Sequence, residues 1–173
     1  GPRVRSRARR APARPDAPPL PLRPLWPKGY RQEVQGVASV LSMDPTFRPD
    51  MVAMIAMSAA FVLTGAPFDG PVAGLRLGYD ENGKLAAFLP AEQLDKGGLD
   101  LVVAGRDEGI MMVEAGASEV TEEQVAEALE FAFDAMQPAI KLQDELAKKV
   151  GVTKLEYELD LPDSKIQNEV NEW

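Results

Sequence analysis

Apolar residues follow two different spacings along the chain, and these spacings predict its strands and helices. Residues 34–41 mix valines with small residues and end before the turn pair Asp44 and Pro45, which predicts a strand of about eight residues. Residues 51–63 are apolar almost all round and are followed by Gly65, a common helix stop. A helix of about thirteen residues is too short to span a bilayer, so we expect protein to cover it on nearly every side.

Two hairpins are predicted in the middle of the chain. The runs VAGLRLGY and KLAAFLP flank residues 80–83, where Asn-Gly between apolar runs is a strong hairpin signal. A second pair of runs, LDLVVAG and GIMMVEAG, flanks residues 106–108. Together the four runs predict one largely antiparallel sheet.

A long helix is predicted to begin at Thr121. Gln124 completes a capping box with Thr121 worth about 1 kcal/mol, and Gly151 is placed to end the helix. Pro138 should bend the helix, because it removes the hydrogen bond to Asp134 at a cost of about 3 kcal/mol. The helix carries an apolar stripe: Val125, Leu129, Ala132, Phe133, Met136, Ile140 and Leu146. The element order predicts an α+β fold with a mostly antiparallel sheet and two packed helices.

Charge divides the chain into a basic start and an acidic remainder. Residues 1–31 carry a net charge of +8, whereas the rest carries −16. Residues 1–22 are almost entirely Arg, Pro and Ala, a composition typical of a disordered arm. Clustered Arg also suits an arm that binds nucleic acid, whereas the acidic remainder would repel nucleic acid unless its basic residues gather on one face.

The absence of two residue types limits the chemistry. The chain has no Cys and no His, which excludes thiolate or imidazole zinc sites, Cys nucleophiles and His-based triads. No run reaches the roughly 20 apolar residues of a membrane span, so no membrane partner is expected. A chain without Cys is compatible with the cytoplasm. Met51, Met54 and Met57 share one helical face, which favours core packing over a ligand surface.

Several longer motifs carry a family resemblance. The runs RPLWPKGYRQEVQ, PDMVAMIAMSAA, TGAPFDGPVAG, LDLVVAG and the segment through MMVEAGA occur in this order between Arg23 and Gly151. This stretch resembles the later half of the first RNase PH-like domain in the bacterial polynucleotide phosphorylase family. The resemblance implies an RNase PH-like (ribosomal protein S5 domain 2-like) half-domain at residues 23–151. Residues 152–173 would then be a linker and the start of an all-helical domain.

The resemblance implies part of a 3′-to-5′ phosphorolytic exoribonuclease, a polyribonucleotide nucleotidyltransferase. Phosphate attacks the terminal phosphodiester of RNA and releases a nucleoside diphosphate with Mg²⁺ assistance, in a cytoplasmic homotrimer that can join an RNA-degradation complex. Chemistry resides in the second RNase PH-like domain of such enzymes, so this segment alone is expected to be inactive and to need no cofactor. The alternative is a non-catalytic scaffold or RNA-binding module that acts only in assembly. A downstream second domain with the catalytic residues would favour the enzyme.

The resemblance implies that this chain differs from the catalytic second RNase PH-like domain at the active-site positions. Pro49 and Asp50 fall where a Ser pair holds the attacking phosphate. A carboxylate about 4 Å from phosphate costs on the order of 4 kcal/mol at an effective dielectric of 20, whereas the helix end contributes only about 0.3–1 kcal/mol. Of the metal and acid-base set, Asp100 remains, with Leu94 and Val102 at the other positions. The resemblance thus implies no catalytic, phosphate-binding or metal-binding residue here.

The remaining functional candidates are Arg23, Lys28 and Arg31, as RNA-binding residues. Arg23 matches a family arginine near the RNA path, and Trp26 or Tyr30 could add a stacking surface. The alternative is that the two aromatic rings pack the entry to the first strand and the charges are merely solvated.

Two expectations concern the ends of the matching segment. The family has a segment resembling RLIDRPL where this chain reads APPLPL, so we hypothesise that residues 1–22 are an out-of-frame translation; another reading frame of the DNA should then encode the family segment. Without the early half of the domain, apolar surface and strand edges should be uncovered. The isolated chain is therefore expected to fold poorly or to associate.

Overall fold

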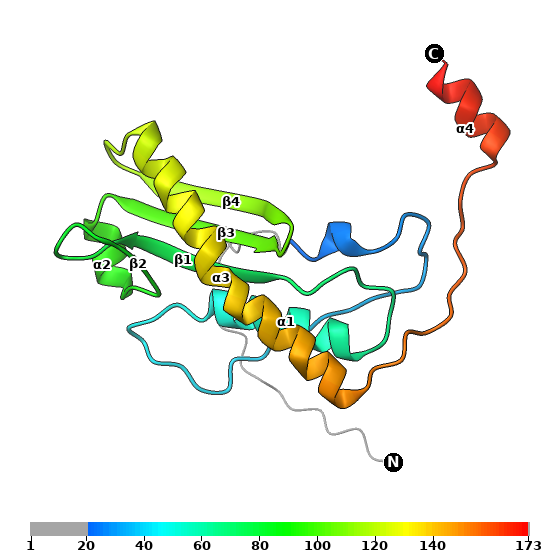
Figure 1. Ribbon diagram of the computed structural model, residues 1–173, viewed down its shortest axis with the longest axis horizontal. Coiled ribbons are helices and arrows are strands. Elements are labelled where there is room, and N and C mark those ends of the chain that lie inside the picture. The colour runs from blue at the N-terminus through cyan, green and yellow to red at the C-terminus, as the bar shows by residue number, and fades with distance from the viewer. Residues whose placement is uncertain (1–20, 173) are drawn as a thin grey trace.

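The computed structural model describes residues 21–172 (Figure 1). The arm predicted over residues 1–22 lies outside the described residues except for Pro21 and Leu22, which are buried. The chain forms these elements in order: η1 Arg23–Leu25, α1 Asp50–Leu63, β1 Ala73–Tyr79, β2 Leu85–Ala87, α2 Ala91–Lys96, β3 Leu99–Arg106, β4 Gly109–Ala117, α3 Glu122–Val150 and α4 Ser164–Asn171.

Both predicted hairpins are confirmed, and they form one antiparallel sheet with strand order β2-β1-β3-β4. Val103 in the centre of β3 pairs with Leu75 of β1 and with Val113 of β4. The β1–β2 turn contains Gly83 at φ 72°, a conformation that glycine adopts without the Cβ penalty. This sheet, with its packed helices, confirms the predicted α+β class.

Alternate residues of the central strands face two different helices. Leu75 and Leu101 pack with Ala132 and Met136 of α3 in one core. Because successive strand residues point to opposite faces, Val102 lies on the other side, where it packs with residues of α1 such as Met54. Figure 1 shows α3 running across the front of the sheet. The sheet is therefore sandwiched between α1 and α3.

The ends of α3 follow the sequence prediction. The N–H of Gln124 donates to Thr121 Oγ1 at 3.3 Å, and the N–H of Thr121 donates to Gln124 Oε1 at 2.9 Å, which completes the capping box. Gly151 has the left-handed conformation, and its N–H donates to the carbonyl of Ala147 at 3.0 Å. The helix continues through Pro138 without interruption.

The strand predicted at residues 34–41 is wrong. The segment is irregular, and Leu41 is 95% exposed. Among the described residues, no backbone hydrogen bond joins this segment to a strand. An extended segment with apolar side chains becomes a strand only when a neighbour takes its backbone hydrogen bonds, and no such neighbour lies beside it here.

The prediction that protein covers α1 on nearly every side is also wrong. Met51 and Met54 are buried as expected and Met57 packs partly against the same core, but Val52 is 62% exposed. One side of α1 rests on the sheet, while the other faces the irregular segment across a groove of about 600 Å³ lined mainly by residues 35–42 and by α1. Within the described residues, the side of α1 that faces away from the sheet lacks the protein cover that its apolar composition predicts.

Two further segments complete the fold. The short helix α2 was not predicted, because six residues are too few to show a helical period. Residues 152–163 form an irregular connector, and the helix predicted after it is confirmed as α4, with the Asp163 carboxylate accepting from the N–H of Lys165. In Figure 1 the connector carries α4 away from the sheet.

Candidate functional site

The predicted RNA-binding residues lie on the first described segment. Pro24 sits in the short turn η1, whose Leu25 is buried and accepts a hydrogen bond from the N–H of Asp69 at 2.9 Å. This anchor leaves Arg23 and Lys28 exposed on the surface. Within residues 21–172 neither of these two side chains forms an ion pair.

Two of the three cations line the same groove. The groove has a volume of about 1130 Å³ and is lined by Arg23 and Arg31 together with Trp26, Tyr30 and Met112 among others. Lys28 is not part of its lining. A groove that combines guanidinium groups with aromatic rings has the composition of single-stranded nucleic-acid sites.

Arg31 is partly neutralised. Its Nε lies 3.6 Å from Oδ2 of Asp160 in the connector, and the two side chains are 73% and 79% exposed. An ion pair this exposed contributes little to stability and is readily exchanged for another anion. Arg31 therefore remains able to contact a phosphate.

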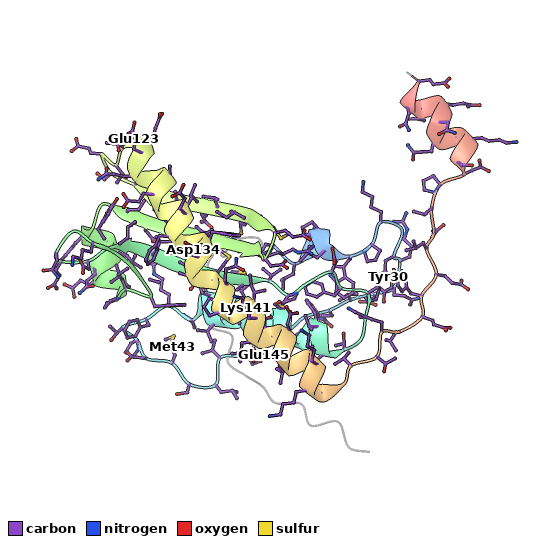
Figure 2. All side chains as sticks on the ribbon, in the orientation of Figure 1. Tyr30, Met43, Glu123, Asp134, Lys141 and Glu145 are labelled. Carbon is purple, nitrogen blue, oxygen red and sulfur yellow. The ribbon has the colours of Figure 1, made fainter. Side chains whose placement is uncertain are left out.

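The two aromatic residues are engaged in packing. Trp26 stacks on Tyr30 with ring centroids 5.6 Å apart and meets Phe61 edge-on at 5.4 Å. Tyr30 also contacts Tyr157 of the connector at 5.8 Å, and Figure 2 shows Tyr30 where the first segment and the connector meet. These are the contacts that the packing alternative expects, although both rings remain partly exposed in the groove.

Pro49 and Asp50 lie at the start of α1, as predicted. Pro49 is the N-cap and makes no side-chain cap, and Asp50 is the first helical residue. One oxygen of the Asp50 carboxylate accepts from the N–H of Met51 at 2.9 Å. The other accepts from Arg76 at 2.6 Å. Asp50 is thus a first-turn charge with a cationic partner on the sheet.

Arg76 joins two carboxylates from different elements. Its NH1 lies 2.6 Å from Asp50 Oδ2, and its Nε lies 2.6 Å from Asp100 Oδ1. Arg48 approaches Asp100 at 3.7 Å and Asp95 of α2 at 3.6 Å. The Arg76 side chain is only 16% exposed, so water screens these contacts weakly. We refer to these five residues as the Arg76 network.

The Arg76 network does not fit a magnesium ion. Mg²⁺ needs carboxylate oxygens that are free to coordinate it, whereas Asp50 and Asp100 already accept from Arg76. Leu94 and Val102, which the resemblance assigns to the other metal and acid-base positions, are buried and apolar. In the described part of the chain, no three Asp or Glu side chains come together in a way that could hold a metal ion.

Arg76, Arg48 and Asp95 are the site residues that sequence reasoning missed. The signal for Arg76 was its place in β1, between Leu75 and Leu77 and therefore on the opposite face of the strand. That face also carries α1, so an arginine there lies near the helix start. Arg48 and Asp95 carry no comparable signal, because their proximity depends on the unpredicted helix α2.

Other charged groups lie outside this network. Arg106 at the end of β3 donates to Asp69 at 2.7 Å, and this hydrogen bond raises the pKa of Arg106 above its ordinary value.

No helix within residues 21–172 has both the length and the apolar composition needed to cross a bilayer.

Comparison with known proteins identifies one kind of relative. Residues 70–135 match the model described as 3′ exoribonuclease family, domain 2. The polyribonucleotide nucleotidyltransferase of Thermus thermophilus is 44% identical over 137 residues, which are 79% of this chain and 19% of that protein. The enzyme of the same name from Natranaerobius thermophilus is 40% identical over 152 residues, 88% of this chain and 21% of that protein. The enzyme of that name from Brachyspira hyodysenteriae is 42% identical over 153 residues, which are 88% of this chain and 21% of that protein.

The chain spans about a fifth of the length of the curated relatives that it matches. The matched domain model lies within the sheet and the first part of α3, which agrees with the position of the motifs and with the observed fold. The chain is therefore homologous to part of the polyribonucleotide nucleotidyltransferases and covers a portion of an RNase PH-like domain.

Proposed function

We propose that this chain is the non-catalytic RNase PH-like portion of a 3′-to-5′ phosphorolytic exoribonuclease and that it contributes structure and RNA contacts. The observation that carries the proposal is the Arg76 network, in which Asp50 and Asp100 are bound to a guanidinium instead of being open to a metal ion. Catalysis and Mg²⁺ binding then belong to another domain of the enzyme. The enzyme would be a cytoplasmic homotrimer that can join an RNA-degradation complex.

The chemistry of the whole enzyme defines what this portion must do. Phosphate attacks the 3′-terminal phosphodiester, the bond to the shortened RNA breaks, and a nucleoside diphosphate leaves. A non-catalytic portion helps by holding the RNA strand so that its 3′ end reaches the reacting groups. The groove lined by Arg23, Trp26 and Arg31 supports this role, because it combines cations for the RNA backbone with aromatic surface.

RNA contact is tested by removing two charges from the full-length enzyme. Arg23→Ala with Lys28→Ala should weaken binding of oligoadenylate and lower the salt slope of log K by about 0.7 for each lost phosphate contact. Lys148→Ala with Lys149→Ala removes the same charge at the exposed end of α3 and is the control. Unchanged affinity and salt slope in the first variant would overturn the proposed RNA contact.

Absence of catalysis is tested on the 173-residue chain. With oligoadenylate, phosphate and Mg²⁺, the chain should release no nucleoside diphosphate, whereas the full-length enzyme should do so under the same conditions. Release that persists in an Arg76→Met variant and is lost in Asp100→Asn would place catalysis in this portion and refute the proposal.

A further inference from the structure

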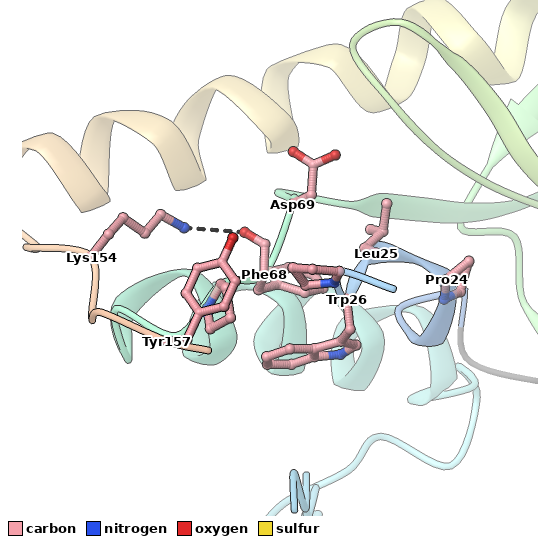
Figure 3. A pocket seen from close by; sticks show the side chains of 9 residues that line it. Pro24, Leu25, Trp26, Phe68, Asp69, Lys154 and Tyr157 are labelled. Carbon is pink, nitrogen blue, oxygen red and sulfur yellow. Dashed lines mark hydrogen bonds between the residues drawn. The ribbon is translucent and has the colours of Figure 1, made fainter. Parts of the chain in front are cut away.

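A second hollow adjoins the groove lined by Arg23 and Arg31 and shares Pro24 and Trp26 with it. It has a volume of about 560 Å³, within the range of roughly 300–1,000 Å³ typical of small-molecule sites. Figure 3 shows how three segments form it: the turn after Arg23, the loop before β1 and the connector. Its lining consists of Pro24, Leu25, Trp26, Pro27, Pro67, Phe68, Asp69, Lys154 and Tyr157.

The floor of the hollow consists of aromatic rings that are held in place by one another. Trp26 is held by the stacked ring of Tyr30 and by Phe68, whose centroid lies 5.5 Å away. Tyr157, from the connector, is half-exposed and is oriented by its contact with Tyr30. Aromatic rings that are already ordered lose little entropy when a second planar ring stacks on them. The floor therefore suits a planar ligand.

The rim offers one cation and one anion. Lys154 Nζ donates to the carbonyl oxygens of Phe68 at 3.1 Å and Ala66 at 3.4 Å, and Figure 3 marks the first of these bonds. An ammonium has three N–H groups, so one stays available for a ligand oxygen. Asp69 accepts from Arg106 through Oδ2, which leaves its other oxygen able to accept from a ligand N–H.

A nucleotide combines the three features that this hollow recognises: a planar ring, N–H donors on the ring and a negatively charged phosphate. We propose that the hollow binds a nucleotide, with the base against Trp26 and Tyr157, the base N–H donating to Asp69, and a phosphate oxygen accepting from Lys154. The hollow shares Pro24 and Trp26 with the groove of the proposed RNA contact, but Arg23, Lys28 and Arg31 are absent from its lining, so this site does not depend on those cations. The nucleotide is either free or part of an RNA strand.

The fluorescence of Trp26 provides the test. The chain has two tryptophans, so Trp173→Phe leaves Trp26 as the sole reporter. Titration of this variant with AMP should give a saturable fluorescence change, whereas ribose 5-phosphate, which lacks the base, should give none. Absence of a saturable change with AMP and also with a short oligoadenylate would overturn the proposal.

Variants then locate the site. Lys154→Met should weaken AMP binding by at least about tenfold, as expected for loss of a charged hydrogen bond, and Tyr157→Leu by about fivefold or more through lost stacking. Lys165→Met removes the same charge in α4 and should leave binding unchanged. Equal effects of Lys154→Met and Lys165→Met would refute the site, with circular dichroism showing that each variant is folded.

Two further measurements complete the test. One distinguishes a free nucleotide from a nucleotide within RNA, and the other distinguishes this site from the proposed RNA contact. Binding of oligoadenylate but not AMP, lost in Lys154→Met, would assign the hollow to a nucleotide within RNA. Arg23→Ala with Lys28→Ala should leave AMP binding intact, so failure of the proposed RNA contact and failure of this site are distinguished. Loss of AMP binding in that double variant would count against a separate site.

Discussion

Ser58 and Gln143, which come from helices on opposite faces of the sheet, hold the backbone of one residue between them. The N–H of Val72 donates to Ser58 Oγ at 2.8 Å, and the carbonyl of Val72 accepts from Gln143 Nε2 at 3.0 Å. Both side chains are buried. Val72 lies immediately before β1, where its backbone groups are outside the sheet ladder. The two side chains therefore replace the strand partner that these groups lack.

Removing the Ser58 hydroxyl should destabilise the fold. In Ser58→Ala the buried N–H of Val72 has no acceptor, so the free energy of unfolding should fall by about 1–3 kcal/mol. Urea denaturation at concentrations where the chain is monomeric measures this change. Ser39→Ala, at an exposed position, should be neutral, and a Ser58→Ala variant as stable as that control would contradict the role of Ser58.

Arg76 should matter for stability more than any surface arginine. Arg76→Met leaves Asp50 and Asp100 without the guanidinium they share, which should lower the free energy of unfolding by about 1.5–3 kcal/mol. Arg76→Lys should recover only part of this loss, because an ammonium cannot form the same forked contact. Arg31→Met, which breaks a largely exposed pair, is the control and should change little. Equal stability of the two Met variants would show that the network is not a stabilising contact.

Asp80 should titrate below its usual range. Its carboxylate accepts from the N–H groups of Lys84 and Asn82 in the β1–β2 turn, both at 2.8 Å. The bond from Lys84 makes the largest contribution and holds the pKa of Asp80 below its ordinary value of 3.8. Because the pKa is lower in the folded chain, Asp80 stabilises the turn above pH 3.8, and this stabilisation is lost as the pH falls through the folded pKa.

Carbon-13 NMR of the carboxyl groups measures this titration directly. The Asp80 signal should have its midpoint below pH 3.8, and the amide signals of Asn82 and Lys84 should move with the same midpoint. In Asp80→Asn these amide shifts should no longer depend on pH in that range. A midpoint at or above 3.8 would rule out the stabilising role of the turn carboxylate.

The exposed segment at residues 34–41 should drive self-association of the isolated chain. Val37 and Leu41 are exposed, and unpaired extended backbone with apolar side chains is a template for pairing between molecules. Val37→Lys with Leu41→Lys should shift sedimentation toward the monomer, whereas Val170→Lys in α4 should not. A wild-type chain that sediments as a sharp monomer and unfolds cooperatively would contradict this expectation.

Local signals in the sequence were sufficient for most elements of the fold. The Asn-Gly turn before Lys84 and the Thr121 capping box each depend on residues within a few positions, and both occur as predicted. The strand prediction for residues 34–41 was wrong for the opposite reason. Strand formation needs a neighbour elsewhere in the fold, and alternation alone cannot supply that neighbour.

The candidate site was less accessible to sequence reasoning. The resemblance implies that Asp50 and Asp100 lie at positions that have lost catalytic partners, but it does not indicate what holds them. Arg76 is distant from both in sequence, and strand pairing with α1 packing brings the three together. The grouping of Arg23 with Arg31 in one groove likewise depends on how the first segment folds back over α1.

The connector has a consequence for how α4 can move. The N–H of Leu155 donates to the carbonyl of Gly65 at 2.8 Å, and the N–H of Asp160 donates to the carbonyl of Gly29 at 2.9 Å. The connector is thus fastened to the core as far as Asp160, and any reorientation of α4 must pivot at residues 161–163. Pro162 fixes its own φ near −65°, which removes one of the few rotations available there. Any reorientation of α4 relative to the connector would therefore be confined to this short hinge.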